Sequence, residues 1–347
     1  MNHLKFSHGQ LRYLAMIGVG GIGSGNFFVL NGNETLGREE SRAGRFLDRR
    51  DYCKLHIIAH YVAVLLGSEF ATFPVGRVGD DPVGRQMLKE MASAGMETCY
   101  VECDPGAQTL YSLCFLYPDG SGGNLTSDDS ASSHLGECDV KRAQPQFLRF
   151  AGRGMALSAP EVPLEARAAL LRTAKEHGFF SAASFTSEEI SSALRCGILK
   201  DVDLLAANRD EAATAAGLVA EKAEVENIIR RAVERFGQEN PSIGLSITAG
   251  KNGSWSWDGE ILRHVPTLSV PVESTAGAGD AHLAGILSGL ALGLKLEEAQ
   301  QLGTLLAALS VTSPHTIHPD VSRAALRQLA LDCWFPSCQR VRELLED

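Results

Sequence analysis

A glycine-rich turn followed by an acid holds the residues of this chain that are best suited to chemistry. Gly277, Ala278 and Gly279 precede Asp280, and apolar residues recur at helical spacing over residues 283–294. Glycine lets successive backbone N–H groups point the same way, and the helix dipole adds partial positive charge at the same place. The pattern predicts an anion site, beside which Asp280 could accept a proton from a hydroxyl attacking a bound phosphate. An ordinary strand-to-helix connection, in which Asp280 only complements the dipole, is the other interpretation.

Polar residues also stand where two predicted strands end. Asn208 follows one of these strands and Glu211 comes about one helical turn later, so an amide and a carboxylate could face one cavity. The same pair would also suit a helix N-cap with a capping-box acid. Thr248 ends the other strand and is followed by a loop with Gly250 and Gly253, which a plain β-turn would explain equally well.

Strands and helices alternate through the middle of the chain, which predicts βαβ units and a parallel sheet. Substrates of such sheets bind at the carboxyl ends of the strands, where these polar residues stand. Short strands in the N-terminal part could form a small separate sheet that covers the site. The main sheet is expected to include 153–158, 179–184, 203–207 and 243–248, and the small sheet a strand after Asn26 and strands around 97–103 and 109–117.

The segment Gly18-Val-Gly-Gly-Ile-Gly23 has the G-x-G-x-x-G spacing of a dinucleotide-binding turn. That turn needs a helix directly after its glycines, so that a pyrophosphate can rest on the helix N-terminus. Residues 24–33 are instead interrupted by glycine and asparagine and are typical of a strand with turns. An NAD-dependent oxidoreductase is therefore the less favoured alternative, which saturable NADH binding would support.

The composition narrows the classes of function. The 347 residues are 44% hydrophobic, which is ample for a sizeable core. A net charge of −10 argues against nucleic acid or an acidic membrane as a general partner. No apolar run approaches the length of a membrane span, and the eight cysteines include no C-x-x-C pair, so we expect a cytoplasmic protein with reduced thiols.

Four short segments match a family pattern in the right order. They are Val78–Gly84, Asn208–Glu211, Thr248–Gly253 and Gly277–Asp280, the last followed by Gly285. Together they resemble the ribokinase or PfkB carbohydrate kinase family, over about residues 12 to 318. The resemblance implies an α/β fold, a ribokinase-like three-layer sandwich with a mostly parallel central sheet and a small β-sheet lid. It implies one domain over residues 1–347, with lid strands inserted at roughly 24–54 and 97–130.

The resemblance also implies roles for these residues. Asp280 would be the catalytic base, and the backbone amides of Gly277, Ala278 and Gly279 would stabilise the transferring phosphoryl group. The Asn208 and Glu211 pair would position Mg²⁺, usually through water, and oxygen ligands of this type suit that ion. The residues implied to contact ATP are Thr248, Gly250 and Gly253 at the phosphates and ribose, with Thr304 and Ser310 at the adenine.

The chain departs from the family pattern mostly on the side of the acceptor. The family commonly has an aspartate soon after the first strand that holds sugar hydroxyls, whereas this chain has glycines and then Asn26. Residues 51–56 replace a common G-G-x-x-x-N segment, so an ordinary ribose-like clamp is not expected. Ser274 stands where an aspartate is usual, which puts activation by a monovalent cation in doubt, and His282 stands where an aromatic residue is common.

Residues 37–54 are rich in arginine and also carry several acids. Mixed charge of this kind is usually a solvated surface with salt bridges. The other interpretation is a cationic rim for an anionic acceptor, such as a sugar phosphate or a sugar acid, because the guanidinium fork matches phosphate and carboxylate. Asn26, Arg38 and Arg42 are the candidate acceptor contacts on this side.

These patterns together predict ATP-dependent phosphorylation of a hydroxyl on a sugar or sugar-like molecule. The expected partners are this acceptor and ATP with Mg²⁺, without nucleic acid or membrane, and a homodimer through the lid is an open option. The main alternative is a catalytically silent regulator that binds a sugar or a nucleotide, because the acceptor side has diverged. Ligand binding without product would identify such a regulator.

Overall fold

A nine-stranded sheet forms the middle layer of the computed structural model, which describes residues 3–119 and 122–346. The strand order is β13-β12-β11-β10-β9-β8-β1-β4-β5. Neighbouring strands from β11 to β5 pair in parallel, and β12 and β13 extend the sheet as antiparallel strands. The bounds are β1 Ala15–Val19, β4 Ala71–Gly79, β5 Val101–Asp104, β8 Gly154–Ser158, β9 Phe180–Ser184, β10 Leu204–Asn208, β11 Gly244–Thr248, β12 Ser254–Trp257 and β13 Leu262–Val265.

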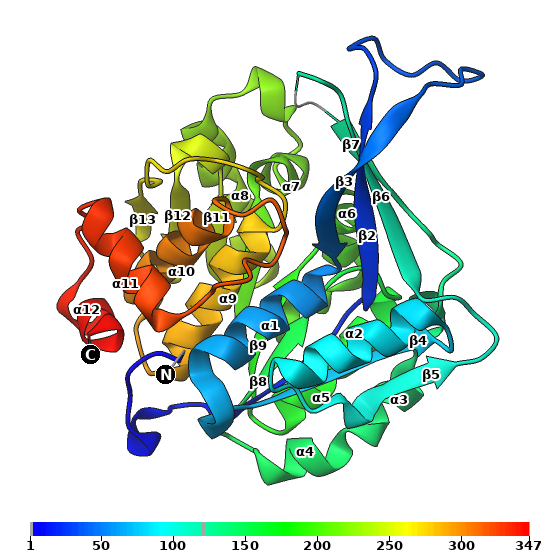
Figure 1. Cartoon of the computed structure of the whole chain (residues 1–347). Coiled ribbons are helices and arrows are strands. Elements are labelled where there is room, and N and C mark those ends of the chain that lie inside the picture. The colour runs from blue at the N-terminus through cyan, green and yellow to red at the C-terminus, as the bar shows by residue number, and fades with distance from the viewer. Residues whose placement is uncertain (1–2, 120–121, 347) are drawn as a thin grey trace.

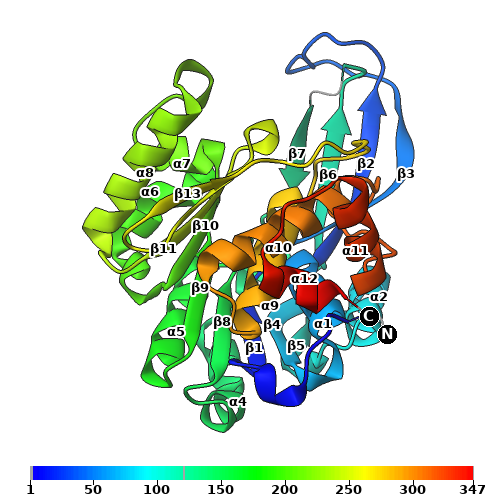
Figure 2. The ribbon, with the colours of Figure 1, turned by 90° about the vertical axis from the view of Figure 1, so that its left-hand side faces the viewer.

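Helices cover both faces of this sheet, which makes three layers (Figures 1 and 2). Met16 packs with helices α1, α2 and α9 to α12, whereas its neighbour Ile17 packs with the helices on the other face, because side chains alternate along a strand. In the described part of the chain, no helix is long and apolar enough to cross a membrane. The bounds are α1 Lys54–Leu66, α2 Pro82–Ser93, α3 Glu137–Arg142, α4 Gln144–Arg149, α5 Leu164–Glu176, α6 Ser187–Cys196, α7 Arg209–Ala215, α8 Val225–Glu239, α9 Ala278–Ala291, α10 Leu296–Ser310, α11 Arg323–Asp332 and α12 Gln339–Leu345.

A second sheet of four strands, in the order β3-β2-β6-β7, stands at the upper right of Figure 1 and forms the lid. Its inner strands β2 and β6 pair in parallel, and the outer strands pair antiparallel to them. The strand expected near 97–103 does not join the lid: β5 pairs with β4, because β4, α2 and β5 form a βαβ unit of the main sheet. The bounds are β2 Gly23–Leu30, β3 Gly44–Tyr52, β6 Leu110–Leu116 and β7 Gly122–Thr126.

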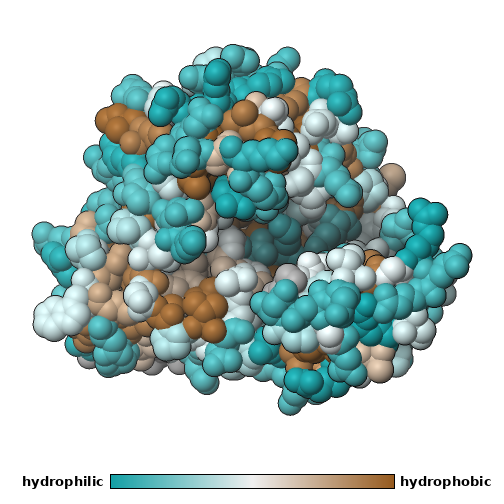
Figure 3. All heavy atoms as spheres, turned by 90° about the horizontal axis from the view of Figure 1, so that it is seen from above, coloured by the Kyte–Doolittle hydropathy of each residue, from teal (hydrophilic) through white to brown (hydrophobic). Residues whose placement is uncertain are grey.

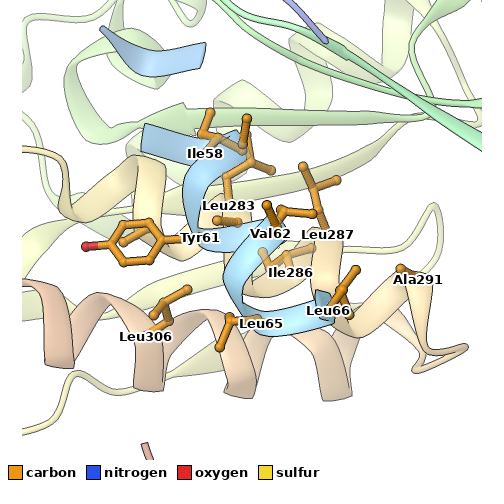
Figure 4. Packing of buried hydrophobic residues seen from close by; sticks show 14 of the residues in the cluster. Ile58, Tyr61, Val62, Leu65, Leu66, Leu283, Ile286, Leu287, Ala291 and Leu306 are labelled. Atoms are coloured by element: carbon orange, nitrogen blue, oxygen red, sulfur yellow. The ribbon is translucent and has the colours of Figure 1, made fainter. Parts of the chain in front are cut away.

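Close packing of α1, α9 and α10 fixes the direction of α9. Gly285 and Gly303 face each other, and a Cβ on Gly285 would lie only 2.6 Å from the Cα of Gly303, so glycine is needed where these two helices meet. The apolar stripe of α1, which includes Val62 and Leu65, packs against Ile286 on α9 (Figure 4). The N-terminus of α9 is thereby held at the carboxyl ends of the main strands.

Candidate active site

The N-terminus of α9 is the centre of the site. Gly277 precedes the helix with φ of 76°, in the left-handed region that favours glycine, and a Cβ there would lie 2.9 Å from the carbonyl oxygen of Thr316. The helix begins at Ala278, and the first backbone N–H groups of a helix have no partner within it. A Cβ on Gly279 would lie 3.9 Å from Thr248 Oγ1, so the turn lies beside the end of β11. This geometry is suited to binding an anion.

Asp280 and Lys54 share a cavity at this turn. Asp280 lies in the first turn of α9, and Lys54 is the first residue of α1. Burial raises the pKa of Asp280, Lys54 opposes this shift, and Asp51 adds to it. The pKa of Lys54 is raised in turn, chiefly by Asp280.

Both residues line a cavity of about 860 Å³, a volume suited to a nucleotide-sized ligand. Seen from above, the molecule is hollowed in the middle, with hydrophilic residues in and around the hollow (Figure 3).

Glu161 reaches the same region from the turn after β8. Its φ of 73° is unusual for a residue with a side chain. Its Oε2 atom accepts the backbone N–H of Lys54 at 3.2 Å. Burial raises the pKa of Glu161 to about 7, although Lys54 lowers it. A strained backbone that holds a partly buried acid near Asp280 is typical of a functional position.

Asn208 and Glu211 combine both of the roles that the sequence left open. Asn208 Oδ1 accepts the backbone N–H groups of Asp210 and Glu211, each at 2.9 Å, and Glu211 Oε2 accepts the N–H of Asn208 at 2.8 Å. The pair therefore caps α7, and it also lines the cavity with Asp280. Burial raises the pKa of Glu211, and Lys54 opposes this shift.

The second carboxylate oxygen of Glu211 is not used by the cap. Carboxylate oxygens of this kind suit Mg²⁺, either as ligands or as acceptors of hydrogen bonds from its water molecules. Within the described ranges, no group of three or more His, Cys, Asp or Glu residues could hold a metal ion by itself.

The candidate phosphate and ribose contacts lie together at the end of β11. Thr248 is the register partner of Asn208 on β10, so their side chains stand at the same edge of the sheet. Gly250 and Gly253 have φ values of 53° and 89°, which a residue with a side chain rarely adopts. All four residues line the cavity.

Helix α10 forms the far end of the cavity. Thr304, Ala307 and Val311 line it, as expected for the position suggested for the adenine. The Ser310 hydroxyl instead donates to the carbonyl of Ala307 at 2.8 Å, and Ser310 is not among the lining residues. Of the two predicted adenine contacts, only Thr304 therefore faces the cavity.

His282 is buried beneath the cavity and is held by hydroxyl groups. Its Nδ1 lies 3.4 Å from Ser246 Oγ and its Nε2 lies 3.2 Å from Ser254 Oγ. Burial lowers the pKa of His282 to about 4, so the ring is neutral near pH 7. The ring packs α9 onto β11 and β12 at the floor of the site.

The glycines of residues 18–23 serve close packing. A strand, β2, follows them, so the helix that a dinucleotide site requires is not present at this position. A Cβ on Gly18 would lie 2.6 Å from Leu55 Cδ1, and one on Gly20 would lie 2.8 Å from Ala159 Cβ. The glycines thus let α1 and the turn after β8 approach β1.

The lid strand β3 is hydrogen-bonded to the loop behind the anion site. The N–H of Tyr52 donates to Thr316 Oγ1 at 3.1 Å, and the N–H of Thr316 donates to the carbonyl of Arg50 at 3.2 Å. Arg49 Nη1 donates to the carbonyl of Glu273 at 3.4 Å. Because the carbonyl of Thr316 also lies against Gly277, the lid and the anion site share one support.

The three candidate acceptor contacts do not line this cavity. Arg38 and Arg42 lie in the loop that joins β2 to β3, where Arg42 Nε pairs with Glu40 at 2.8 Å. Asn26 lies on β2 and is exposed. A Cβ on its neighbour Gly25 would point toward Asp51 and Ser112. Because side chains alternate along a strand, the Asn26 side chain points to the opposite face of the lid sheet.

Arg38 is exposed, and Arg42 is held within the loop by Glu40 and the carbonyl of Glu34. A surface segment with salt bridges therefore describes these two residues better than the cationic-rim interpretation does.

Sequence patterns missed Lys54, Glu161 and Asp51. Lys54 is the first residue of α1, Asp51 lies near the end of β3 and Glu161 lies in the turn after β8. Polar residues are common at such positions and carry no motif. One signal was present: the unusual residues 51–56 replace the family's glycine-rich segment at the start of α1. Their meeting with Asp280 depends on contacts between segments that are more than 100 residues apart.

Comparisons with known sequences agree with this geometry. A sequence model described as pfkB family carbohydrate kinase matches residues 58–323. The uncharacterized sugar kinase YegV of Escherichia coli is 33% identical over 120 residues, which are 35% of this chain and 36% of that protein, so the match spans about a third of this relative. Ribokinase of Haemophilus influenzae is 24% identical over 251 residues, which are 72% of this chain and 78% of that protein.

Solved structures show the same fold. The structure of ribokinase from Giardia lamblia has a TM-score of 0.75 at 18% identity and covers 92% of this chain and 99% of that chain. Ribokinase from Cryptococcus neoformans, in complex with ADP, has a TM-score of 0.72 at 19% identity and covers 92% of this chain and 99% of that chain. The predicted ribokinase-like α/β fold is confirmed. Because the family match covers more than half of its length, the chain belongs to the pfkB family of carbohydrate kinases.

Proposed function

We propose that this protein transfers the terminal phosphoryl group of ATP to a hydroxyl group of a sugar or sugar-like molecule. One observation carries the proposal: the Asp280 carboxylate lies at the N-terminus of α9, beside Lys54, in the cavity that Asn208 and Glu211 also line. Phosphoryl transfer needs a base, a site for anionic oxygens and nearby positive charge in one place.

Asp280 would act as the general base. It would accept the proton of the acceptor hydroxyl while the hydroxyl oxygen bonds to the γ-phosphorus, the bond from that phosphorus to the bridging oxygen breaks, and ADP leaves. The raised pKa of Asp280 suits this role, because a carboxylate with higher proton affinity is a stronger base. The backbone amides at Gly277, Ala278 and Gly279 would hold the phosphoryl oxygens, and Lys54 would offset their charge.

ATP would occupy the part of the cavity between β11 and α10. Thr248, Gly250 and Gly253 support this placement, because they line that space. Two structural neighbours are described as ribokinase complexes with ADP and with ribose and ATP. Mg²⁺, when bound, would offset the charge of the ATP phosphates, and Asn208 and Glu211 would hold it through water.

The relatives leave the acceptor open. They are named ribokinase, deoxyribokinase and fructoselysine 6-kinase, among others, so the family contains several acceptor types. Asn26, Arg38 and Arg42 give no support to an anionic acceptor, because they do not line the cavity.

The test is an ADP-release assay with Mg²⁺ and ATP over a panel of sugars, amino sugars, sugar acids and sugar phosphates. Asp280→Asn should lower kcat by roughly 10²-fold or more, because general-base catalysis contributes about that much. Binding of ATP, measured by calorimetry, should be unchanged within about twofold, since Asp280 does not hold the nucleotide. Turnover that persists in this variant would exclude the mechanism, and ATP binding without ADP release for every acceptor would favour the silent regulator.

A further inference from the structure

A network of uncharged hydrogen-bonding groups lies under the end of the cavity that α10 forms. Ser246, Ser254, His282 and Thr304 line the cavity, and the side chain of Gln300 is wholly buried behind them. Ser254 Oγ is the meeting point of the network, because Gln300 Nε2 donates to it at 3.0 Å. His282 Nε2 lies 3.2 Å and Thr304 Oγ1 lies 3.4 Å from the same oxygen. A hydroxyl has one proton and two lone pairs, so these three neighbours use all the hydrogen-bonding capacity of Ser254.

The Ser246 hydroxyl decides which nitrogen of His282 carries the proton. In the described part of the chain, its hydrogen-bond partner is His282 Nδ1 at 3.4 Å, and Ser246 is only 2% exposed. If Nδ1 were protonated, the proton of Ser246 would have no acceptor in the protein, whereas a bare Nδ1 accepts it. Burial lowers the pKa of His282 to about 4, so the ring carries a single proton near pH 7. That proton is therefore on Nε2, which donates to Ser254 Oγ.

The proton of the Thr304 hydroxyl is left for a ligand. Both lone pairs of Ser254 Oγ are taken by N–H donors, so Ser254 donates its own proton to Thr304 Oγ1. A hydroxyl in a helix often donates to a carbonyl one turn back, as Ser310 on the same helix does to Ala307 at 2.8 Å. Among the described residues, Thr304 has no such bond, and its hydrogen-bond neighbours are Ser254 and His282. Because Thr304 lines the cavity, its proton is available there.

We propose that His282 is a positioning residue for the nucleotide: with its proton on Nε2, it orients Ser254 so that the Thr304 hydroxyl donates to a ring nitrogen of the nucleobase. This inference rests on the kinase function proposed above and adds the polar contact that holds the base. The ring nitrogens of adenine that carry a free lone pair accept hydrogen bonds, so they complement a donor at Thr304. An aromatic residue in place of His282 could not donate to Ser254, so the contact depends on a feature particular to this chain.

The experiment measures the Kd of ATP and of its 1-deaza, 3-deaza and 7-deaza analogues, in each of which C–H replaces one ring nitrogen. We expect one analogue to bind about fivefold more weakly than ATP, the scale of one hydrogen bond, and the other two to bind within about twofold of ATP. Thr304→Val keeps the shape and removes the proton, so it should bind ATP and that analogue equally. Thr304→Ser keeps the hydroxyl and should keep the preference. Thr312→Val is the matched control, because the Thr312 hydroxyl donates to the carbonyl of Leu309 and Thr312 does not line the cavity.

His282→Phe tests the positioning role. Without the Nε2–H donor, one lone pair of Ser254 becomes free and the Thr304 proton turns toward it, so the preference for ATP over the analogue should fall below about twofold. A ring that served packing alone would change the melting temperature and leave this preference as it is. A nitrogen-15 NMR spectrum of the histidine rings gives a direct measure, because the signal that is missing in His282→Phe should show its proton on Nε2 at pH 7.

The outcomes separate this inference from the kinase function. Equal binding of ATP and all three analogues, with ADP still released from ATP, would overturn the inference and leave the kinase intact. A preference that survives Thr304→Val or His282→Phe, or a proton on Nδ1 of His282, would also overturn it. Melting temperatures report whether the variants are folded, and Thr304→Val decides the matter if His282→Phe does not fold. Failure to bind ATP and to release ADP with every acceptor would overturn both proposals.

Discussion

Lys54 determines the charge balance around Asp280. As the first residue of α1, it brings one ammonium group to a place where burial alone would favour protonated acids. The pKa of Lys54 is raised because Asp280 and then Glu211 and Glu161 favour its charged form. In the part of the chain that the structure describes, its ammonium forms no hydrogen bond or ion pair, so it is available to a bound phosphate.

The replacement Lys54→Met tests this balance through pH. Lys54 lowers the pKa of Asp280, so its removal should raise that pKa further. Because the base works only when it is deprotonated, the acidic limb of the kcat profile should move to higher pH, and kcat at its maximum should fall by at least about tenfold. A pH series of kcat with saturating substrates measures both effects. Lys222→Met, at an exposed position, is the control, and an unmoved acidic limb would exclude the proposed coupling.

At the scale of elements, the turn before α9 needs a conformation that only glycine adopts easily. Gly277 has φ of 76° and lies against the carbonyl of Thr316, a residue whose hydroxyl and backbone N–H are hydrogen-bonded to the lid strand β3. The segment before it is also tied down, because the N–H of Glu273 donates to the carbonyl of Val311 at 2.8 Å. The direction of the first N–H groups of α9 is therefore set by two neighbouring segments.

The replacement Gly277→Ala should destabilise this turn. The left-handed φ and the contact at 2.9 Å should together cost about 1–3 kcal/mol in the free energy of unfolding, and kcat should fall because the amides shift. Gly237→Ala provides the opposite control: this glycine lies inside α8 with nothing within 4 Å of its Cβ position. It should gain roughly 0.5–1 kcal/mol. Urea denaturation and kcat measure both variants, and equal stability of the two would contradict the argument.

At the scale of the whole molecule, the lid is joined to the main body at the anion site. Strand β3 meets residues 315–316 through the backbone of Arg50 and Tyr52, and the same loop supports Gly277. We therefore expect a movement of the lid to shift the place where the phosphoryl group would bind. The proposed homodimer through the lid stays a prediction.

The replacement Thr316→Val should weaken this contact between β3 and residues 315–316. The side chain keeps its shape but loses the oxygen that accepts the N–H of Tyr52. Loss of one hydrogen bond is worth about 1 kcal/mol, so amide exchange at Tyr52 should become about fivefold faster. Hydrogen exchange read by NMR measures it. The matched control is Thr312→Val, whose hydroxyl donates to the carbonyl of Leu309, and it should leave Tyr52 unchanged. Equal protection of the Tyr52 amide against exchange in both variants would show that the Thr316 hydroxyl does not hold β3.

The sequence by itself determined the features that depend on local spacing. The glycine turn, the start of α9 and the βαβ alternation were all predicted, because helix and strand periods and turn chemistry act over a few residues. The capping box at Asn208 and Glu211 was recognised for the same reason. The family resemblance came from motifs of this local kind.

Only the tertiary structure decided which side chains meet. Asp51, Lys54 and Glu161 come to Asp280 because parallel register and helix packing bring distant segment ends to one edge, and no local pattern encodes this. The arginine-rich loop showed the converse: Arg38 and Arg42 looked suited to an anion, yet the lid carries them away from the cavity. The same holds for β5, which the sequence assigned to the lid and whose crossover after α2 places it in the main sheet. Local chemistry was readable from the sequence, whereas the charge of the acceptor site depends on long-range contacts.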